Sequence, residues 1–441
     1  MSFRASGRRF VRQAIGHPVL TSIALAVVVR SICLVAVSIT GVDIALDETT
    51  YFRAAHAASR GELAALWDGY GQQLYEANRA YLAPIAALFE VVTPSLTAGR
   101  VVSVALGSMT AGLVALVVSQ LASTRWALTA GAVVALVPSQ VWWSTGFLRE
   151  SAIWLACVGT WLAVASLARG GYLPLAGLAF GALLVGALAY MRGQTMVVVL
   201  LAFLLAGIVL ARTWPIRVGV VMIAVAVPLA TGYGVFGWTL LREVDESGAA
   251  RGELAVRADS ALVDLEPLDP SSAAAVEARR IDATRGRHGS GARARAARQR
   301  IYVEDEGGTR IAVIVLRDGT VYRVDDGAVT NLRRLPGAMI DVALRPFPWE
   351  RASGTSVRLA ALESPLWLLL FAAASVGLVA GRRRWRSLAF PALFVGGMVV
   401  AAALTQGNLG TAFRHRGQLV WAVAALIAVG LGSARWEPSR G

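Results

Sequence analysis

Asp47 and Glu48 are the first residues in this chain whose types and spacing could do chemistry. The two carboxylates follow a long apolar run by a few residues, and Tyr51 lies one helical turn beyond Asp47. A carboxylate at the mouth of a helix bundle could serve as a general base or as a metal ligand. Asp and Glu are also common at helix starts, where they interact favourably with the helix dipole. The pair is therefore a catalytic candidate with a structural alternative.

A second acid, Glu150, follows Arg149 where two apolar runs join. Ionisable residues at the end of a membrane span are costly unless they pair or face a wet cavity. Glu150 could therefore face the Asp47–Glu48 pair across a cavity. The alternative is a local ion pair between Arg149 and Glu150 that only anchors the helix.

Several cations are predicted on the same side of the membrane as these acids: Arg192 and the run Arg414-His415-Arg416. Guanidinium groups bind phosphate bidentately and keep their charge, so two arginines flanking a histidine would make a good phosphate clamp. For Arg192 and Arg416 the alternative is an arginine that extends from the span end to anchor it at the membrane surface.

Arg345 and Arg30 are two further candidates. Arg345 begins a segment with two prolines and two aromatic residues, which suits substrate contact or an aromatic membrane anchor equally well. Arg30 lies inside the first apolar run, where an arginine is functional or pairs with an acid in the bundle interior.

The composition identifies the class of protein that must position these residues. The chain has 441 residues, of which 56% are hydrophobic and 16% charged, and its net charge is +14. A soluble domain has about a quarter of its residues charged, and disorder requires low hydrophobicity. These values predict a membrane protein. All 42 basic residues are arginine, which excludes lysine Schiff-base chemistry and a Walker-type lysine.

The cysteines and histidines of the chain do not form a recognisable metal-binding pattern. Cys33 and Cys157 lie in apolar runs, and none of the four histidines forms an i, i+4 pair. These patterns disfavour a disulfide framework, a thiolate site and a zinc centre, so no metal ligands are assigned.

Apolar runs long enough to span a bilayer predict ten transmembrane helices, because about 20 apolar residues cross the hydrocarbon core. The first run is too long for a cleaved signal sequence and is expected to remain as a span. The ten runs are 18–40, 100–121, 126–142, 148–168, 172–190, 194–211, 218–240, 362–380, 387–405 and 417–433.

Arginine placement predicts the orientation. Short loops and both termini on one side hold fourteen arginines against Glu437 alone, a net charge of +13. The positive-inside rule makes this side cytoplasmic, and we expect a multi-pass plasma-membrane protein with both termini inside. Because topology accounts for nearly all the excess charge, a nucleic-acid partner is excluded.

The predicted fold class is an all-α polytopic membrane protein with two long exoplasmic segments. Residues 41–99 should form interfacial helices within a transmembrane module 1–240. Residues 241–361 form a small α+β insertion, where strands 310–316 and 320–324 flank an Asp-Gly turn typical of a hairpin. Residues 362–441 hold the last helices and a cytoplasmic tail.

The order of these features resembles the GT-C superfamily of integral membrane glycosyltransferases, which includes protein O-mannosyltransferases and aminoarabinose transferases. In that superfamily an Asp-Glu type motif and a tyrosine follow the first span, as Asp47, Glu48 and Tyr51 do here. A later span opens with an arginine, which Arg100 resembles, and Glu150 matches a further acid at the start of the fourth span. The stretches 335–350 and 408–416 look like an unassigned bacterial subgroup related to these transferases.

One departure concerns the interfacial helix. Many members have a His-Pro-Pro-Leu type sequence there, whereas this chain has Tyr81-Leu-Ala-Pro84-Ile, without histidine. No donor or acceptor contact is therefore assigned to this helix.

The resemblance implies transfer of a sugar from a polyprenyl-phosphate donor to an exoplasmic acceptor, with inversion at the anomeric carbon. Asp47 would be the general base, and Glu48 and Glu150 would position it or bind sugar hydroxyls. The superfamily has metal-dependent and metal-independent members, so a divalent metal cofactor is left open. The cations would bind substrate, with the lipid phosphate held by Arg192, Arg414 and Arg416.

Two other classes of function remain open. One is a polysaccharide ligase or polymerase that uses a lipid-diphosphate oligosaccharide, with Arg414-His415-Arg416 as the active cluster. The other is a transporter or envelope scaffold. Transporters usually place polar residues near the bilayer midplane, whereas most polar groups here lie at span ends.

Overall fold

The computed structural model describes residues 16–42, 44–45, 47–233, 265–288, 301–304, 310–315, 320–324, 335–350, 355–405 and 409–433. The chain divides into two compact units. The first comprises residues 1–237, 347–398 and 413–441, and the second comprises 238–346 and 399–412.

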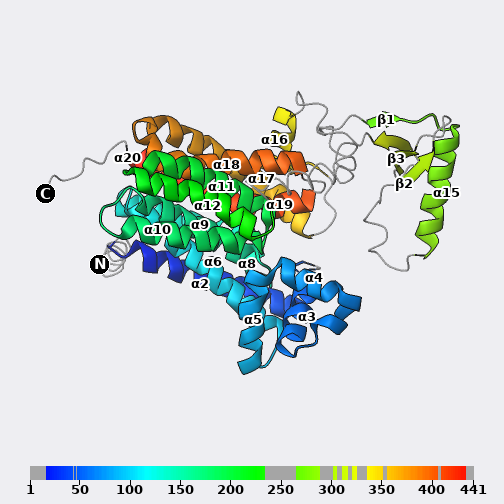
Figure 1. Ribbon diagram of the computed structural model, residues 1–441, viewed down its shortest axis with the longest axis horizontal. Helices are drawn as coiled ribbons and strands as arrows, with labels where there is room; N and C mark the ends of the chain where they lie inside the picture. Colours follow the sequence, from blue (N-terminus) through cyan, green and yellow to red (C-terminus); the bar gives the residue numbers. More distant parts are fainter. Residues whose placement is uncertain are drawn as a thin grey trace, which may run out of the picture. The chain divides into compact units, whose positions relative to one another are not determined.

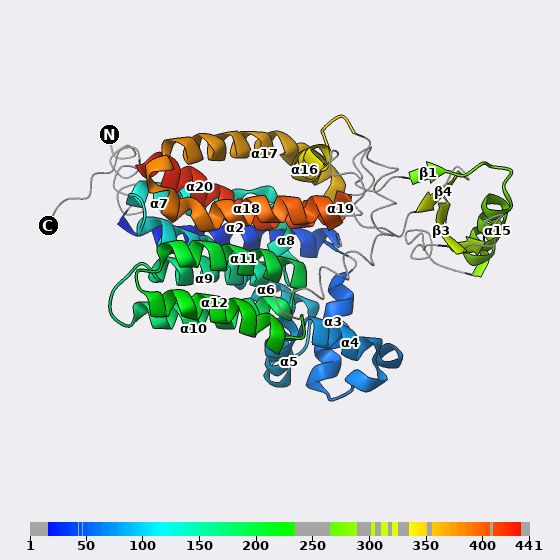
Figure 2. The same ribbon diagram turned by 45° about the horizontal axis from the view of Figure 1, so that its top comes forward.

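Long apolar helices make up the body of the first unit (Figures 1 and 2). They are α2 (Pro18–Thr40), α6 (Leu96–Ser119), α7 (Thr124–Leu136), α8 (Pro138–Thr145), α9 (Glu150–Ser166), α10 (Leu173–Ala189), α11 (Gly193–Leu210), α12 (Trp214–Ala230), α17 (Thr355–Ala380), α18 (Trp385–Thr405), α19 (Leu409–Arg416) and α20 (Val420–Ser433), with the short turns η4 (Arg382–Arg384) and η5 (Gly417–Leu419). The C-terminal end of α18 and the start of α19 belong to the second unit.

Six of these helical segments are long and apolar enough to cross a membrane, or seven if the bent pair α7 and α8 is one span. Each of the ten predicted spans contains an apolar helix, but α9, α10 and α12 have only 17 residues each. At 1.5 Å per residue, such a helix reaches about 26 Å, slightly less than the hydrocarbon core. The chain is therefore a polytopic membrane protein, while the count of ten spans stays a prediction.

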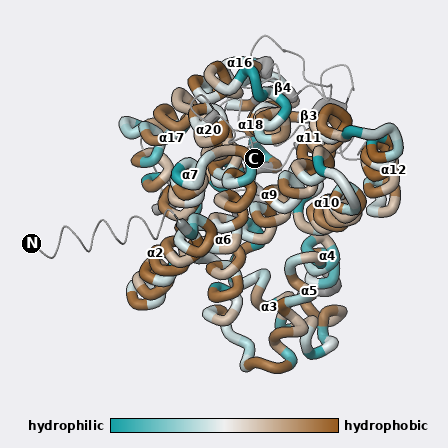
Figure 3. The backbone as a smooth tube through the Cα atoms, turned by 90° about the vertical axis from the view of Figure 1, so that its left-hand side faces the viewer, coloured by the Kyte–Doolittle hydropathy of each residue, from teal (hydrophilic) through white to brown (hydrophobic). Residues whose placement is uncertain are grey.

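Helix α2 shows why a bilayer is the expected surrounding of this body. Its outward side chains include Ile32, which is 65% exposed, and Ile39, which is 79% exposed. Figure 3 shows the helix as mainly hydrophobic along its length. Exposed apolar surface of this extent is unfavourable in water and favourable against lipid.

Arg30 of α2 is buried next to a break between α7 and α8. These two helices meet at Val137–Pro138 with a bend of 56°, and a proline cannot supply the N–H that would bond to the Val134 carbonyl. Arg30 donates instead to the carbonyl oxygens of Val134 and Ala135, each at 3.2 Å. The expectation that Arg30 pairs with an acid is wrong, because its hydrogen-bond acceptors in the described structure are carbonyls and a hydroxyl.

That hydroxyl is Ser144 Oγ of α8, which lies 2.7 Å from Arg30 Nε. Gly107 of α6 makes room for the contact, because a Cβ there would lie 2.7 Å from Ser144 Cβ and 3.1 Å from Arg30 Nε. Arg30 thus fixes both halves of the broken helix, and α8 leads directly into the residues that open α9.

Helices also fill the segment 41–99, as predicted: α3 (Asp47–Ser59), η1 (Leu63–Gly69), α4 (Tyr70–Ala77) and α5 (Arg79–Val91). Aromatic side chains join α3 and α5, with Tyr51 and Tyr81 packed edge to face at a centroid distance of 6.4 Å. Tyr81, in the stretch that departs from the superfamily pattern, forms a hydrogen bond of 3.0 Å with Ser103 of α6. The placement of these helices along a membrane surface stays a prediction.

The second unit contains an antiparallel sheet in the order β1-β4-β3-β2, built from β1 (Leu265–Pro267), β2 (Ile301–Glu304), β3 (Arg310–Val315) and β4 (Val321–Val324). The predicted hairpin is confirmed, since Val315 of β3 pairs with Val321 of β4. Its Asp-Gly turn lies outside the described residues. Helix α15 (Ala273–His288) packs Ala275 and Ala278 against the valines of the sheet. The unit also includes α16 (Leu335–Leu344).

Candidate active site

The predicted acids and cations of the first unit meet at one end of its helices. Asp47 opens α3, Glu150 opens α9, Arg192 precedes α11 and Arg414 lies near the end of α19. Figure 2 shows the α2–α3, α8–α9 and α10–α11 connections at this end. The α6–α7, α9–α10, α11–α12 and α17–α18 connections lie at the opposite end. They carry Arg169, Arg212 and Arg382–Arg384, which are among the arginines predicted to be cytoplasmic.

Arg414 joins the two acids. Its Nη1 and Nη2 each lie 3.1 Å from Asp47 Oδ2, and its Nε lies 3.4 Å from Glu150 Oε1. The Asp47 side chain is 55% exposed, whereas that of Glu150 is 1% exposed. Glu150 therefore sits at the closed end of the cluster, and Asp47 is the acid that a substrate can reach.

Arg192 completes the chain of charges. Its Nη2 donates to Glu150 Oε1 at 2.8 Å, and both side chains are buried. Burial lowers the pKa of Arg192 to about 10, against the opposing effect of the Glu150 carboxylate. At neutral pH the guanidinium is thus still charged, and Asp47, Arg414, Glu150 and Arg192 form a continuous ion-pair network, which we call the site cluster.

The local Arg149–Glu150 pair is absent from the ion pairs of the described residues. Adjacent helical residues point in different directions, so i and i+1 side chains do not face each other. Arg149 instead donates through Nη1 to Asn78 Oδ1 of the α4–α5 connection and to the Met191 carbonyl. Arg149 therefore ties the α4–α5 connection to the α10–α11 turn.

Glu48 accepts three hydrogen bonds from two residues outside the site cluster. Arg100 of α6 donates to its two carboxylate oxygens at 3.0 and 2.8 Å, and the Phe147 backbone N–H donates at 2.6 Å. The Glu48 residue is 1% exposed. Of the two roles expected for Glu48, this geometry suits positioning: the residue fixes the first turn of α3 against α6 and the α8–α9 connection.

Tyr51 lies one turn after Asp47 on α3 and is 5% exposed. Residues four apart share a helix face. Burial raises the pKa of Tyr51, partly offset by the positive charge of Arg149. Tyr51 is therefore a neutral phenol at physiological pH, beside the site cluster.

Trp143 is a site residue that the sequence analysis missed. The Arg414 guanidinium carbon lies 5.2 Å from the centre of the Trp143 ring, within the range of a cation–π interaction. Trp143 is on α8, and its ring also packs against Phe413 at 5.7 Å. The Trp142-Trp143 pair, which precedes Arg149 in the sequence by six residues, could have indicated an aromatic support for a cation.

The rest of the Arg414-His415-Arg416 run faces different surroundings. His415 is buried within electrostatic reach of Arg192, Arg414 and Arg149. Arg416 is 1% exposed, and the acid whose charge acts on it is Glu363. The three predicted phosphate ligands are thus divided, with Arg192 and Arg414 in the site cluster and Arg416 beside Glu363.

Glu363 was also missed by the sequence analysis. It lies in α17, where its Oε1 accepts hydrogen bonds from Ser139 Oγ at 2.7 Å and Trp367 Nε1 at 2.8 Å. A carboxylate within an apolar run is a functional candidate by default. The hydropathy of the run 362–380 predicts a span, and Glu363 within that run is the signal that marks the residue as a candidate.

Arg345 belongs to the second unit, at the end of α16. Its Nη1 lies 3.9 Å from Asp341 Oδ2, four residues earlier in the chain. Its predicted role as a substrate ligand stays a prediction.

The site cluster and its neighbours contain buried polar atoms that no other atom of the described residues satisfies. In the described structure, those without a hydrogen-bond partner include Arg192 Nη1, Glu150 Oε2, Ser151 Oγ, Arg149 Nε and Trp143 Nε1. Buried polar atoms are nearly always hydrogen-bonded to protein, water or ligand. This end of the bundle therefore has donors and acceptors suited to a polar ligand.

The balance of charge at the site favours an anion. Arg149, Arg192 and Arg414 stand against Asp47 and Glu150, which leaves an excess of one positive charge. Within the described ranges, no group of three or more His, Cys, Asp or Glu residues could hold a metal ion. The arrangement can bind an anionic group while presenting one accessible carboxylate.

Comparison of the chain with protein-family models, with curated proteins and with solved structures finds no match.

Proposed function

We propose that this protein is a membrane glycosyltransferase, which moves a sugar from a polyprenyl-phosphate donor to an exoplasmic acceptor. One observation carries the proposal: a half-exposed carboxylate, Asp47, is bound by Arg414 at the open edge of a buried network of cations. A base and an anion-binding group are thus adjacent, as displacement of a phosphate by a hydroxyl requires.

In this reaction the acceptor hydroxyl oxygen attacks the anomeric carbon, and Asp47 takes the hydroxyl proton. The bond between the anomeric carbon and the phosphate oxygen breaks, and the lipid phosphate leaves with the electron pair. A single in-line displacement inverts the configuration at the anomeric carbon. Arg192 and Arg414 stabilise the departing phosphate, because charged bidentate contacts to phosphate are strong.

The Asp47–Arg414 contact suggests how donor binding prepares the base. Before the donor binds, Asp47 Oδ2 accepts hydrogen bonds from both Nη atoms of Arg414. When the donor phosphate binds to Arg414, the positive charge is shared between two anions. Asp47 Oδ2 is then released from Arg414 and can accept a hydrogen bond from the acceptor hydroxyl when the leaving group is in place.

Analysis of cell-envelope glycans tests this proposal. A deletion strain is complemented with the wild-type protein, with Asp47→Asn or with Glu62→Gln, at equal protein levels. Glu62 is an exposed acid in the same segment and pairs only at the surface with Arg60. The wild type and Glu62→Gln should restore the missing glycan, and Asp47→Asn should not. Full restoration by Asp47→Asn would exclude Asp47 as the base.

The position of His415 supports a second candidate, a ligase or polymerase that uses a lipid-diphosphate oligosaccharide. His415 lies buried among three arginines, a setting that suits a substrate with two phosphates. In that case His415→Ala should abolish glycan transfer and Asp47→Asn should leave it largely intact. The glycosyltransferase proposal predicts that Asp47→Asn is the more severe change.

A further inference from the structure

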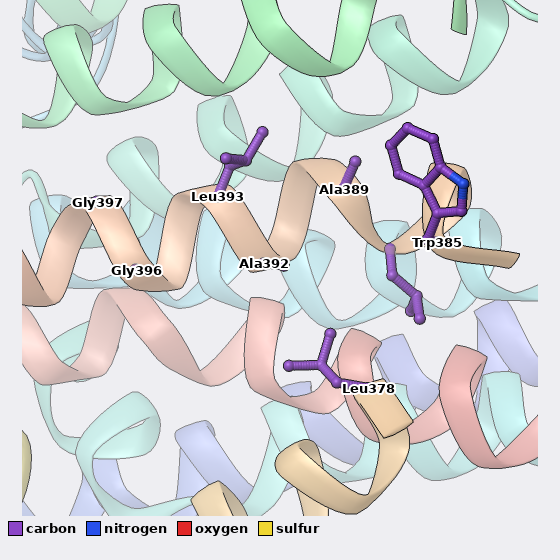
Figure 4. A pocket seen from close by; sticks show the side chains of 8 residues that line it. Leu378, Trp385, Ala389, Ala392, Leu393, Gly396 and Gly397 are labelled. Atoms are coloured by element: carbon purple, nitrogen blue, oxygen red, sulfur yellow. The ribbon is translucent and has the colours of Figure 1, made fainter. Parts of the chain in front are cut away.

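The end of the bundle opposite the site cluster contains an apolar groove. Its cavity volume is about 560 Å³, within the range of roughly 300–1,000 Å³ that is typical of small-molecule sites. Figure 4 shows Trp385, Ala389 and Leu393 at successive turns of α18, with Leu378 on the neighbouring α17. The lining residues are Leu378, Trp385, Leu388, Ala389, Ala392, Leu393, Gly396 and Gly397.

Small side chains along α18 create the groove. Ala389, Ala392 and Gly396 recur at helical spacing, so they share one face of the helix. The next residue, Gly397, is turned toward the bundle, where an added Cβ would lie 2.9 Å from Val198 of α11. At Gly396 an added Cβ would meet no atom within 4 Å. The floor of the groove is therefore open to an apolar chain.

Basic and aromatic residues stand at one end of the groove. The turn between α17 and α18 has the sequence Arg382-Arg383-Arg384-Trp385-Arg386, without an acid. Arg382, Arg383 and Arg386 are exposed, and the Arg386 guanidinium carbon lies 5.9 Å from the centre of the Trp385 ring. Trp385 thus lines the groove and contacts the basic turn, as interfacial tryptophans do at the level of lipid headgroups.

We infer that this groove binds an anionic phospholipid of the bilayer, with an acyl chain in the groove and the phosphate at Arg382, Arg383 and Arg386. The lining is apolar, which suits an acyl chain, and the turn at the mouth carries exposed arginines and no acid between residues 382 and 386, which suits a headgroup with net negative charge. A zwitterionic lipid matches the lining but not the mouth. The inference shares no residue with the site cluster and does not depend on the proposed function.

The size of the preference follows from the number of arginines. Each arginine close to an anionic membrane surface strengthens binding about fivefold. Three exposed arginines then favour phosphatidylglycerol over phosphatidylcholine of the same acyl chains by on the order of a hundredfold. If one arginine bound the headgroup more weakly, the preference for phosphatidylglycerol would still exceed about tenfold.

Native mass spectrometry of the purified full-length protein can measure this preference. The protein is titrated separately with phosphatidylglycerol, with phosphatidylcholine of matched chains and with glycerol phosphate. We expect phosphatidylglycerol to bind most tightly. The triple variant Arg382→Gln/Arg383→Gln/Arg386→Gln should bind both lipids equally. Gly396→Leu should weaken the binding of both lipids at least tenfold, because its side chain fills the open floor.

A matched control is the triple variant Arg125→Gln/Arg169→Gln/Arg212→Gln, which removes three exposed arginines within or next to other connections at the same end. It should keep the wild-type preference. Thermal unfolding in detergent checks that each variant is folded, and Ala392→Leu replaces Gly396→Leu if the latter fails to fold.

Three results would overturn the inference. One is equal binding of the two lipids by the wild type. Another is unchanged phosphatidylglycerol binding by the groove-filling variant. The third is tight binding of glycerol phosphate alone, which would show that the apolar groove contributes nothing.

Discussion

At the scale of single residues, Arg414 and Glu150 each have two partners of opposite charge. Arg414 contacts Asp47 and Glu150, and Glu150 contacts Arg414 and Arg192. Because the partners are shared, removing one residue alters the surroundings of the others. The acid at the exposed end of this network can change partner when an anion binds, whereas the buried acid is needed to offset the arginines around it.

Replacing Glu150 tests that distinction. In Glu150→Gln the buried Arg192 loses its counter-charge, and breaking a buried ion pair costs about 3–5 kcal/mol. We therefore expect a large fall in the thermal unfolding temperature of the purified protein. Glu150→Gln/Arg192→Met, which removes both charges, should recover part of it. If Glu150→Gln unfolds at a temperature as high as that of Glu62→Gln, the charge of Glu150 does not stabilise the fold.

Tyr51 predicts a specific response to alkaline pH. Burial raises its pKa in the folded protein, whereas in the unfolded chain the phenol titrates near pH 10. The stabilisation from its neutral form is complete below about pH 10 and is lost as pH rises toward the folded-state pKa. Tyr51→Phe should therefore flatten the decline of unfolding free energy above about pH 10.

The control for that measurement is Tyr172→Phe, since Tyr172 is 77% exposed at the start of α10. Its alkaline decline should match the wild type. Identical declines in Tyr51→Phe and the wild type would contradict the assigned burial of the phenol.

At the scale of elements, the site depends on a helix that is broken at Pro138. The break turns α8 away from α7 by 56°, and α8 then delivers Trp143 and the α8–α9 connection to the charges of the site cluster. Arg30 bridges the break by binding two carbonyl oxygens of α7 and a hydroxyl of α8. An arginine inside a span is thus explained by the geometry of its neighbours rather than by catalysis.

Arg30→Met tests this role. It leaves two buried carbonyl groups without donors, and each unsatisfied buried group costs about 1–3 kcal/mol. The unfolding temperature should fall well below that of the wild type, and glycan transfer per folded molecule should fall as α8 moves. Arg125→Gln, an exposed change at the start of α7, is the control. Unchanged stability in Arg30→Met would mean that the break is held by other contacts.

At the scale of the whole molecule, the sequence predicted the helices and the hairpin, because these depend on local patterns of residues. Hydropathy located an apolar helix in every expected span, and β3 and β4 form the hairpin that flanks the Asp-Gly signal. Hydropathy alone does not fix the number of membrane crossings, because α7 and α8 bend within one apolar run and three helices have only 17 residues.

Local sequence patterns could not predict the contacts within the site. The Asp47–Arg414 pair joins residues 367 positions apart, and the Glu48–Arg100 pair joins residues 52 apart. Residue types and sidedness indicated which groups could meet. Which oxygen each guanidinium binds depends on how the helices pack and turn. Arg149 and Glu150 illustrate this, since these neighbours in sequence have separate partners.

The incorporation of labelled sugar into envelope glycans by isolated membranes, which contain the native donors and acceptors, tests the role of Asp47 most directly. Membranes with equal amounts of wild type, Asp47→Asn and Glu62→Gln are compared. A general base contributes about 10²–10⁴-fold to the rate. We expect at least a hundredfold lower incorporation with Asp47→Asn and wild-type incorporation with Glu62→Gln. Wild-type incorporation with Asp47→Asn would contradict the assignment of Asp47 as the base.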